Sequence, residues 1–198
     1  MKSVIYHSYE PNEDLEETSN DLACFFNNVK YSAGNNVLLV GNIGNLGNRL
    51  RALGVYVTIL ENSFYGDVCY SLIHNCNCNV IRGCLEALPF EDQYFDKIII
   101  LDHFNNISNY KDALKEISRV LKDDGEIILE DLNLKNLRVK LKNFRHKILG
   151  ENINYRYPNE IINLFSKWNF YGQLKEFDNK RYIYIGKKIE NLNILNIK

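Results

Sequence analysis

The chain has 198 residues, of which 45% are hydrophobic and 25% are charged, and its formal net charge at pH 7 is -1. These values indicate a globular chain with one sizeable core, and they exclude a protein that attracts nucleic acid or anionic membranes through its total charge. No apolar run has the length of a membrane span, the N-terminus lacks a signal-peptide core, and the five cysteines are interpreted as thiols, so a cytoplasmic protein is expected.

A short apolar strand followed by a glycine-rich turn is the central feature of the first third of the chain. Residues 37–40 are continuously apolar, Gly41 and Gly44 follow, and leucines then recur at helical spacing from Leu46 to Leu53. A strand, a tight turn and a helix N-terminus in this order present backbone N–H groups to a nucleotide-like ligand. The turn does not match the dinucleotide-binding pattern G-x-G-x-x-G, so it predicts a site without naming the ligand.

The remaining elements alternate between helices and strands. Gly54 is expected to end the helix that starts near Leu46, and a β-branched strand over 55–60 leads to Glu61. This alternation between residues 37 and 130 predicts βαβ units and a parallel sheet with helices on both faces, closed at the end by a hairpin. Further helices are expected over 13–29, 63–74, 110–121, 134–148 and 158–167, a turn at 123–125, and further strands over 79–82, 95–101, 126–129, 170–177 and 181–186.

Two later segments carry a recognisable pattern. Residues 83–96 read GCLEALPFEDQYFD, and residues 113–125 read ALKEISRVLKDDG. They resemble G-D-A-x-x-L-P-F-x-D-x-x-F-D and A-L-x-E-x-x-R-V-L-K-P-G-G of the class I S-adenosylmethionine-dependent methyltransferases, in the branch that contains many small-molecule methyltransferases. The resemblance covers about residues 35–187. It implies an α/β, Rossmann-like three-layer sandwich with a seven-stranded, mostly parallel sheet in the order 3-2-1-4-5-7-6, in which strand 7 is antiparallel.

The expected organisation is a single methyltransferase-like domain over residues 1–198. Residues 1–34 are assigned to an N-terminal lid or helical segment and residues 35–187 to the core. A basic helical insert is expected within the core over about residues 133–157.

The resemblance also implies where the cofactor S-adenosylmethionine lies. In the family it occupies the carboxyl ends of strands 1, 2 and 4, as ligands of open parallel sheets generally do. Glu61 matches the carboxylate that binds both ribose hydroxyls, and the backbone N–H of Leu85 matches a group that meets the adenine ring. The cofactor-binding positions implied in this way are Gly41, Asn42, Gly44, Glu61, Asn62, Cys84, Leu85 and Leu101.

The same positions depart from the family pattern in three ways. Leu39 stands where the first motif has an acidic residue, the loop is one residue short so that its middle glycine is lost near Ile43, and Cys84 replaces an Asp. A thiol is a weak hydrogen-bond acceptor. These departures leave open a second interpretation, a catalytically inactive methyltransferase-like binding or partner protein.

Candidate catalytic residues follow the fourth strand, where the family lines its reaction site. Asp102 or His103 can act as a general base if the acceptor must lose a proton, and the alternative is that both are polar residues of a surface loop. No metal site is expected, because Cys69, His74, Cys76 and Cys78 do not have the spacing of a zinc knuckle.

The predicted helix 134–148 is basic and amphipathic. It contains lysines and arginines but no acid, and one apolar stripe made of Leu134, Leu137, Leu141, Phe144 and Ile148. Such a helix can hold an anionic substrate, a nucleic acid or a membrane surface, or it can cover the core with a solvated basic face.

The expected function is methyl transfer from S-adenosylmethionine to a small-molecule acceptor, an anionic one included. No membrane partner is expected. A nucleic-acid acceptor is the weakest of the three hypotheses, because Leu101-Asp102-His103-Phe104 does not supply the N-P-P-Y-like segment of many nucleic-acid methyltransferases.

Overall fold

The computed structural model describes residues 29–43, 45–61, 78–151, 153–176 and 180–189. The chain divides into two compact units, Met1–Tyr31 and Ser32–Lys198, and the fold below belongs to the second unit. Gly44 and Asn62, the 63–74 helix and nearly all of the 13–29 helix lie outside the described residues. The single-domain organisation therefore stays a prediction.

The described elements follow the expected order along the chain, with boundaries that differ by a few residues. They are β1 (Asn36–Gly41), α2 (Leu46–Ala52), β2 (Tyr56–Glu61), β3 (Asn79–Arg82), β4 (Phe95–Leu101), the 3-10 turn η1 (Phe104–Asn106), α4 (Tyr110–Val120), β5 (Leu121–Leu132), α5 (Leu137–Ile148), α6 (Pro158–Ser166), β6 (Phe170–Glu176) and β7 (Arg181–Lys188).

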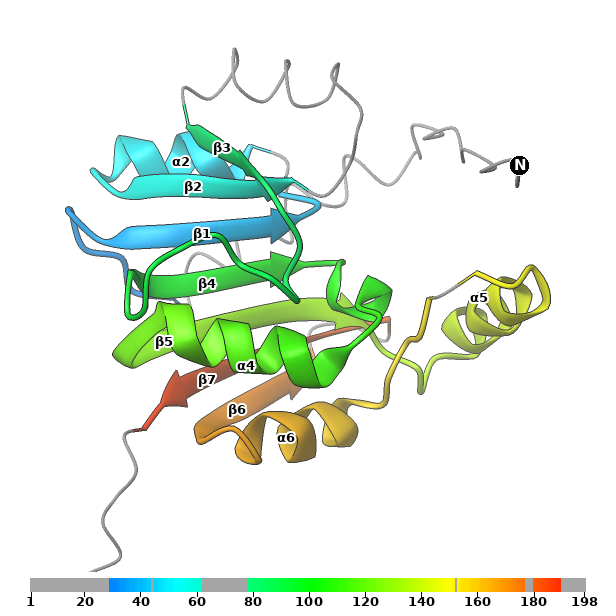
Figure 1. Ribbon diagram of the computed structural model, residues 1–198. Helices are drawn as coiled ribbons and strands as arrows, with labels where there is room; N and C mark the ends of the chain where they lie inside the picture. Colours follow the sequence, from blue (N-terminus) through cyan, green and yellow to red (C-terminus); the bar gives the residue numbers. More distant parts are fainter. Residues whose placement is uncertain (1–28, 44, 62–77, 152, 177–179, 190–198) are drawn as a thin grey trace, which may run out of the picture. The chain divides into compact units, whose positions relative to one another are not determined.

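The strands form one seven-stranded sheet in the order β3-β2-β1-β4-β5-β7-β6, as predicted. The pairs from β3 to β5 are parallel, whereas β7 runs antiparallel to both of its neighbours. The order of the strands reverses between β1 and β4, which is where ligands of open α/β sheets bind, beyond the carboxyl ends of the strands. Figure 1 shows this edge at the arrowheads of β1 and β4.

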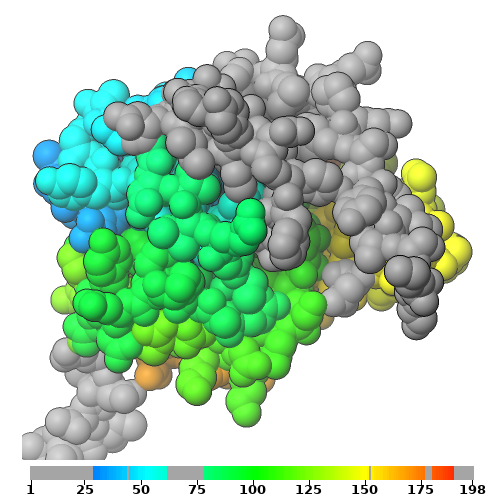
Figure 2. All heavy atoms as spheres, turned by 45° about the horizontal axis from the view of Figure 1, so that its top comes forward, coloured from blue at the N-terminus to red at the C-terminus, as the bar shows by residue number. Residues whose placement is uncertain are grey.

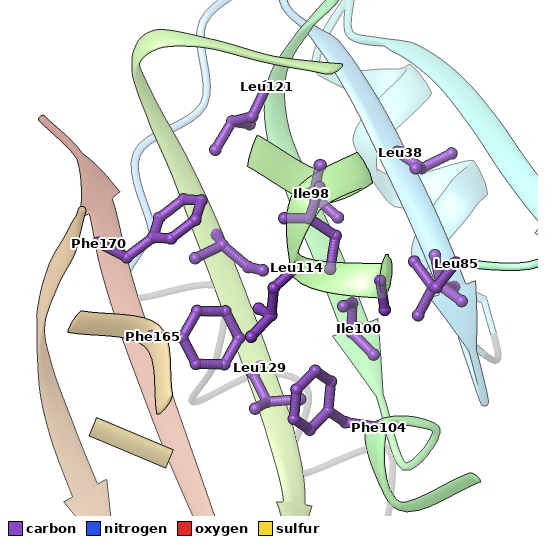
Figure 3. Close-up of a cluster of buried hydrophobic side chains, with 14 of the residues drawn as sticks. Leu38, Leu85, Ile98, Ile100, Phe104, Leu114, Leu121, Leu129, Phe165 and Phe170 are labelled. Carbon is purple, nitrogen blue, oxygen red and sulfur yellow. The ribbon is translucent and has the colours of Figure 1, made fainter. Parts of the chain in front are cut away.

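The core lies on both faces of the sheet because the central strands are apolar at successive positions. Leu38 and Ile98 belong to a cluster that packs under α4 and α6 through Leu114 and Phe165, as Figure 3 shows. Side chains alternate along a strand, so the equally buried Leu39 points to the other face, which α2 covers behind the sheet in Figure 1. Burying each such side chain stabilises the fold by roughly 1.5–3 kcal/mol, which fixes the sheet on which the site is built.

The helix after the glycine turn ends as the sequence predicted. Gly54 has a φ of +78°, and its N–H donates to the carbonyl of Arg51 at 2.9 Å. The N–H of Val55 donates to the carbonyl of Leu50 at 3.2 Å. These two bonds are the Schellman arrangement, which satisfies the last carbonyls of α2 and turns the chain into β2.

The fifth strand is longer than expected, because the predicted turn at 123–125 is a bulge inside it. Phe95 of β4 pairs with Leu121, whereas Lys97 pairs with Glu126. Between these two pairs β5 therefore contains more residues than β4, and the extra residues form the bulge. Ion pairs tie this bulge to neighbouring strands, with Lys122 Nζ 2.8 Å from Asp96 and Lys188 Nζ 2.9 Å from Asp123.

The basic helix is shorter than expected and faces the other way. It begins at Leu137, and its buried residues are Val139 and Asn143 rather than the predicted apolar stripe. Among the described residues, no helix combines the length and the apolar character that crossing a membrane requires.

Candidate functional site

The register of the sheet brings three predicted cofactor positions to one level. Val40 pairs with Leu60 of β2, and the next residue, Gly41, pairs with Leu101 of β4. Glu61 therefore ends β2 at the level where Gly41 ends β1. The N–H of Gly83 donates to the carbonyl of Glu61 at 3.1 Å, which joins the exit of β3 to the same edge.

Gly41 is required by packing of the protein on itself. Its φ is +92°, and a Cβ built on it would lie 2.1 Å from the carbonyl oxygen of Leu101 and 2.7 Å from the Cβ of His103. No side chain fits there, so this glycine lets β1 end directly against the end of β4. The sequence suggested that a glycine is needed here so that a ligand can approach the backbone. The packing of β1 against the end of β4 is a second reason for a glycine at this position.

The first amides of the glycine turn are used inside the protein. The N–H of Asn42 donates to the carbonyl of Leu101 and that of Ile43 to the carbonyl of Gly41, each at 2.9 Å. Ile43 is buried, and so is Leu39, which packs within β1 at the position where the family has an acid. The described part of this turn therefore offers a ligand its exposed Asn42 side chain rather than these two amides.

His103 lies among carboxylates at this edge. Burial lowers the pKa of its imidazole below the ordinary 6.5, and the negative charges of Glu61, Glu86 and Asp102 oppose that shift. Because the net direction is downward, the ring is mostly neutral at pH 7 and has a nitrogen available to accept a proton. The structure thus brings two of the predicted positions, Glu61 and His103, within electrostatic reach of one another.

Asp102 begins the loop after β4 in a left-handed conformation, with a φ of +46°. Its N–H donates to the carbonyl of Glu130 at 3.0 Å, which continues the β4–β5 pairing by one residue. Desolvation by the surrounding protein raises the pKa of the Asp102 carboxyl, although the residue keeps solvent contact, and the charges of Lys142 and Arg181 act in the opposite direction.

The residue that sequence reasoning missed is Asp131, which lies next to Asp102 in the site. It is 3% exposed and accepts three hydrogen bonds. The backbone N–H of Asn105 donates to Oδ2 at 3.1 Å, the Asn105 side-chain amide donates to Oδ1 at 2.9 Å, and the Leu132 N–H donates to Oδ1 at 2.7 Å. Burial, followed by the nearby charge of Asp102, raises the pKa of Asp131 well above its usual range.

A pattern in the sequence does point to Asp131. Ile127 and Leu129 face the core, and side chains two residues apart in a strand lie on the same face. Asp131 is the next position of that series, so a carboxylate at an inward-facing position near the end of β5 is itself an unusual feature. Such perturbed carboxyls in low dielectric are typical of functional sites.

An arginine and two tyrosines complete the β4–β5 side of the edge. The Arg156 guanidinium lies over the Tyr110 ring, with Cζ 3.9 Å from the ring centroid. Tyr182 pairs with Asp131 across β5 and β7, and burial raises the pKa of its phenol well above the usual value. The N–H of Asn154 donates to the Asn105 carbonyl at 2.9 Å, which holds the segment before Arg156 against η1.

The connection that carries Cys84 and Leu85 is fastened to α4. Arg119 donates to the carbonyls of Leu88 at 3.0 Å and Phe90 at 2.7 Å, and it forms an ion pair with Glu116 at 2.7 Å. The two sequence segments that carry the family resemblance therefore bind each other. Cys84 is half-buried, whereas the side chain of Leu85 belongs to the core, so the predicted adenine contact can involve only its backbone.

The part of the chain with described coordinates holds no group of three or more His, Cys, Asp and Glu side chains suited to a metal ion. Cys69, His74 and Cys76 lie outside that part, and Cys78 is buried.

Comparison with known proteins gives a sequence match and a set of similar folds. Residues 44–129 match the model of the family described as "Methyltransferase domain". Among curated relatives, the uncharacterized protein MJ1252 of Methanocaldococcus jannaschii is 34% identical over 46% of this chain and 38% of its own length. A demethylmenaquinone methyltransferase of Staphylococcus haemolyticus is 42% identical over 28% of this chain and 23% of its own length. The chain thus matches less than half the length of these relatives.

Two solved structures show the same fold over nearly the whole chain. The complex of the Haloferax volcanii Trm112 methyltransferase activator with a methyltransferase gives a TM-score of 0.72 at 14% identity, covering 89% of this chain and 92% of that one. An S-adenosylmethionine-dependent methyltransferase from Aquifex aeolicus gives 0.69 at 15% identity, covering 91% and 94%. Residues 44–129 thus match a methyltransferase domain, and the seven-stranded sheet has the strand order of the class I S-adenosylmethionine-dependent methyltransferase fold.

Proposed function

We propose that this protein binds S-adenosylmethionine at the carboxyl edge of β1, β2 and β4 and transfers its methyl group to a small-molecule acceptor. The observation that carries the proposal is the level placement of Gly41, Glu61 and Leu101 at the switch in strand order. The demethylmenaquinone methyltransferase among the relatives supports a small-molecule acceptor, but its match is too short to name one.

The residues at the edge suit one part of this cofactor well. A carboxylate can accept hydrogen bonds from two adjacent ribose hydroxyls, and Glu61 supplies a half-buried carboxylate at the end of β2. When bound, the cofactor supplies an electrophilic methyl group together with its own leaving group. The protein then contributes proximity, orientation and exclusion of water rather than a nucleophile.

The β4–β5 side supplies groups for an acceptor that must lose a proton. A neutral His103 imidazole can take that proton, and burial raises the pKa values of the neighbouring Asp102 and Asp131 carboxyls above their ordinary range. The positive charges of Lys142 and Arg181 act on Asp102. Positive charge at this position favours an anionic acceptor.

A second candidate function is that of a methyltransferase-like protein that binds a partner without catalysis. Its specific support is that the amides of Asn42 and Ile43 donate within the protein and that Leu39 is packed in the core. Both features reduce the polar groups available to the amino-acid end of the cofactor.

Thermal unfolding with S-adenosylhomocysteine separates these two functions. At about 100 times its dissociation constant the ligand should stabilise the fold by roughly 2.7 kcal/mol. Replacing Glu61 by alanine should weaken binding by a factor on the order of 10 to 100, because hydrogen bonds to charged groups contribute about 1.5–3 kcal/mol. The matched control is Glu91→Ala, which removes an exposed carboxylate in the connection before β4.

The stabilisation of the wild-type protein and the effect of Glu61→Ala can be interpreted independently of each other. No stabilisation of the wild-type protein at millimolar ligand would contradict cofactor binding and favour the non-catalytic function. Equal losses in Glu61→Ala and Glu91→Ala would show that ribose recognition by Glu61 is wrong while binding itself stands.

A further inference from the structure

Helix α5 is held to the rest of the protein through one narrow face. Val139 and Asn143 are buried, and the Asn143 side chain accepts a hydrogen bond from the Tyr155 N–H at 3.4 Å. His146, one turn further, pairs with Glu151 and packs beside the ring of Tyr155. These contacts fix the orientation of the helix and therefore decide which side chains point outward.

The opposite face of α5 is apolar and exposed. The spacing of four, three and four residues places its four large side chains on one stripe of a helix with 3.6 residues per turn. α4 differs, because its apolar residues Ala113, Leu114, Ile117 and Val120 are all 0% exposed. The α5 apolar stripe consists of Leu137 (71% exposed), Leu141 (62%), Phe144 (63%) and Ile148 (68%).

Positive charge flanks this stripe on both sides. At 3.6 residues per turn, Lys140 and Lys147 fall along one border and Arg138 and Arg145 along the other. With Lys142, the helix carries five basic residues and no acidic one. Figures 1 and 2 show α5, in yellow, set apart from β1 and α2.

We propose that α5 docks the protein on an anionic membrane surface, with the α5 apolar stripe in the interface and its basic borders on lipid phosphates. A helix with large apolar side chains on one face and lysines and arginines around it has the form of an interfacial helix. The charge is complementary to anionic headgroups, and each base near such a surface strengthens binding. This proposal departs from the expectation that the protein has no membrane partner.

Other occupants match the stripe less well. A second copy would bring two sets of five basic residues together. A nucleic-acid duplex offers phosphates to the basic borders, but its base faces are stacked on one another and are not available to Leu141 or Phe144. The acidic segment 10–21 of this chain has six acids but Leu15 as its single large aliphatic residue, so it complements the charges and not the stripe.

The docked helix lies close to the candidate site. The charge of Lys142 acts on Asp102, and the segment that follows α5 is bonded through Asn154 to Asn105. Docking therefore brings the carboxyl edge of the sheet near the lipid surface. Membrane binding itself requires no cofactor and does not rest on methyl transfer.

Flotation of the full chain with lipid vesicles tests the proposal. Phosphatidylcholine vesicles containing about a third phosphatidylglycerol should carry the wild-type protein, and pure phosphatidylcholine vesicles should not. Leu141→Gln and Phe144→Gln should each lower the partition coefficient on the order of tenfold, and the pair Lys140→Gln/Lys147→Gln by a similar factor. Because all four positions are exposed, thermal unfolding should remain within about 2 °C of wild type.

Matched controls remove equivalent groups elsewhere. Tyr171→Gln deletes an apolar side chain that is 57% exposed on β6, and Lys111→Gln/Lys115→Gln removes two exposed charges of α4. Neither control should change flotation. If the control variants lost as much vesicle binding as the α5 variants, the binding would be due to total charge or to non-specific hydrophobic adsorption, and the proposal would be overturned.

Three further outcomes would also overturn it. One is the absence of wild-type protein from anionic vesicles. Another is binding to duplex DNA that survives Leu141→Gln and Phe144→Gln, which would make α5 a nucleic-acid surface. The third is vesicle binding that appears only after Glu13, Glu16 and Glu17 are replaced by glutamine, which would show that the acidic segment covers the stripe.

Discussion

The two halves of the carboxyl edge are built differently. On the β1–β2 side, Gly41 and Glu61 are positioned by strand register, and the amides of Asn42 and Ile43 donate to the protein's own carbonyls. On the β4–β5 side, Asp131 and Asn105 form a buried hydrogen-bond network beside Asp102. The first half depends on backbone geometry and the second on titratable side chains, so substitutions in the two halves should have different consequences.

This difference bears on the assignment of roles. The cofactor side departs from the family pattern at Leu39 and Cys84, whereas the side expected to face the acceptor holds the groups with shifted pKa values. Shifted pKa values mark places where burial and charge have been arranged around a proton-exchanging group. The chemistry specific to this chain is therefore expected on the β4–β5 side.

The largest effect is expected from Gly41→Ala. The new Cβ would meet the Leu101 carbonyl at 2.1 Å, and the φ of +92° is strained for any residue with a side chain. We expect a loss of about 4 kcal/mol in the free energy of unfolding, measured by urea titration. Gly34→Ala is the control, because Gly34 also has a positive φ of +88° but nothing within 4 Å of its Cβ. It should cost about 1 kcal/mol. Equal costs would mean that β1 and β4 do not meet as described.

A smaller effect is expected from Arg119→Gln, which loosens the connection carrying Cys84 and Leu85. The substitution removes the bonds to the carbonyls of Leu88 and Phe90 and the ion pair with Glu116. We expect a loss of about 2 kcal/mol in thermal or urea unfolding, since hydrogen bonds of this kind contribute about 1 kcal/mol each or more. Lys115→Gln, an exposed charge on the same helix, should change stability by less than about 0.5 kcal/mol. A neutral Arg119→Gln would show that the two segments fold independently of this contact.

The smallest effect near pH 4 is expected from Asp131→Asn, at about 1 kcal/mol, because an amide replaces a carboxyl of the same shape. Its pH dependence is more informative. The folded pKa of Asp131 is raised above its unfolded value, so the stabilising protonated form is fully present below the unfolded pKa and is lost as pH rises through the folded pKa. Wild type should therefore lose stability relative to Asp131→Asn as pH is raised from about 4. A difference that is constant with pH, or that changes in the opposite direction, would contradict burial of this carboxyl.

The order of the strands was predicted from the family resemblance, whereas most element boundaries could be predicted because apolar runs and glycines determine them locally. Residues 95–101 are continuously apolar apart from Asp96 and Lys97, and the predicted strand coincides with β4. Gly54 likewise marked the end of α2, since its positive φ is available to glycine without strain. The bulge at 122–125 was not predicted, because its ion pairs join it to β4 and β7, which neighbour β5 in the sheet but lie away from it in the sequence.

The candidate site could be predicted only in part. Glu61 ends β2, Asp102 and His103 directly follow β4, and these positions are visible in the sequence. The role of Asp131 depends on the burial of its carboxyl and on the amides of Asn105 and Leu132, which only the folded structure brings together. The orientation of α5 was missed for a similar reason. Periodicity identifies an apolar stripe, but contacts of Asn143 and His146 with the following segment decide that the stripe faces outward.

The most direct test of cofactor binding at this edge is amide chemical-shift mapping by NMR during titration with S-adenosylhomocysteine. We expect saturable shifts at Gly41, Asn42, Glu61, Leu85 and Leu101, with Gly172 and Gly186 of the β6–β7 hairpin unaffected. No shifts at millimolar ligand, or shifts that cluster away from the carboxyl ends of β1, β2 and β4, would contradict the central claim.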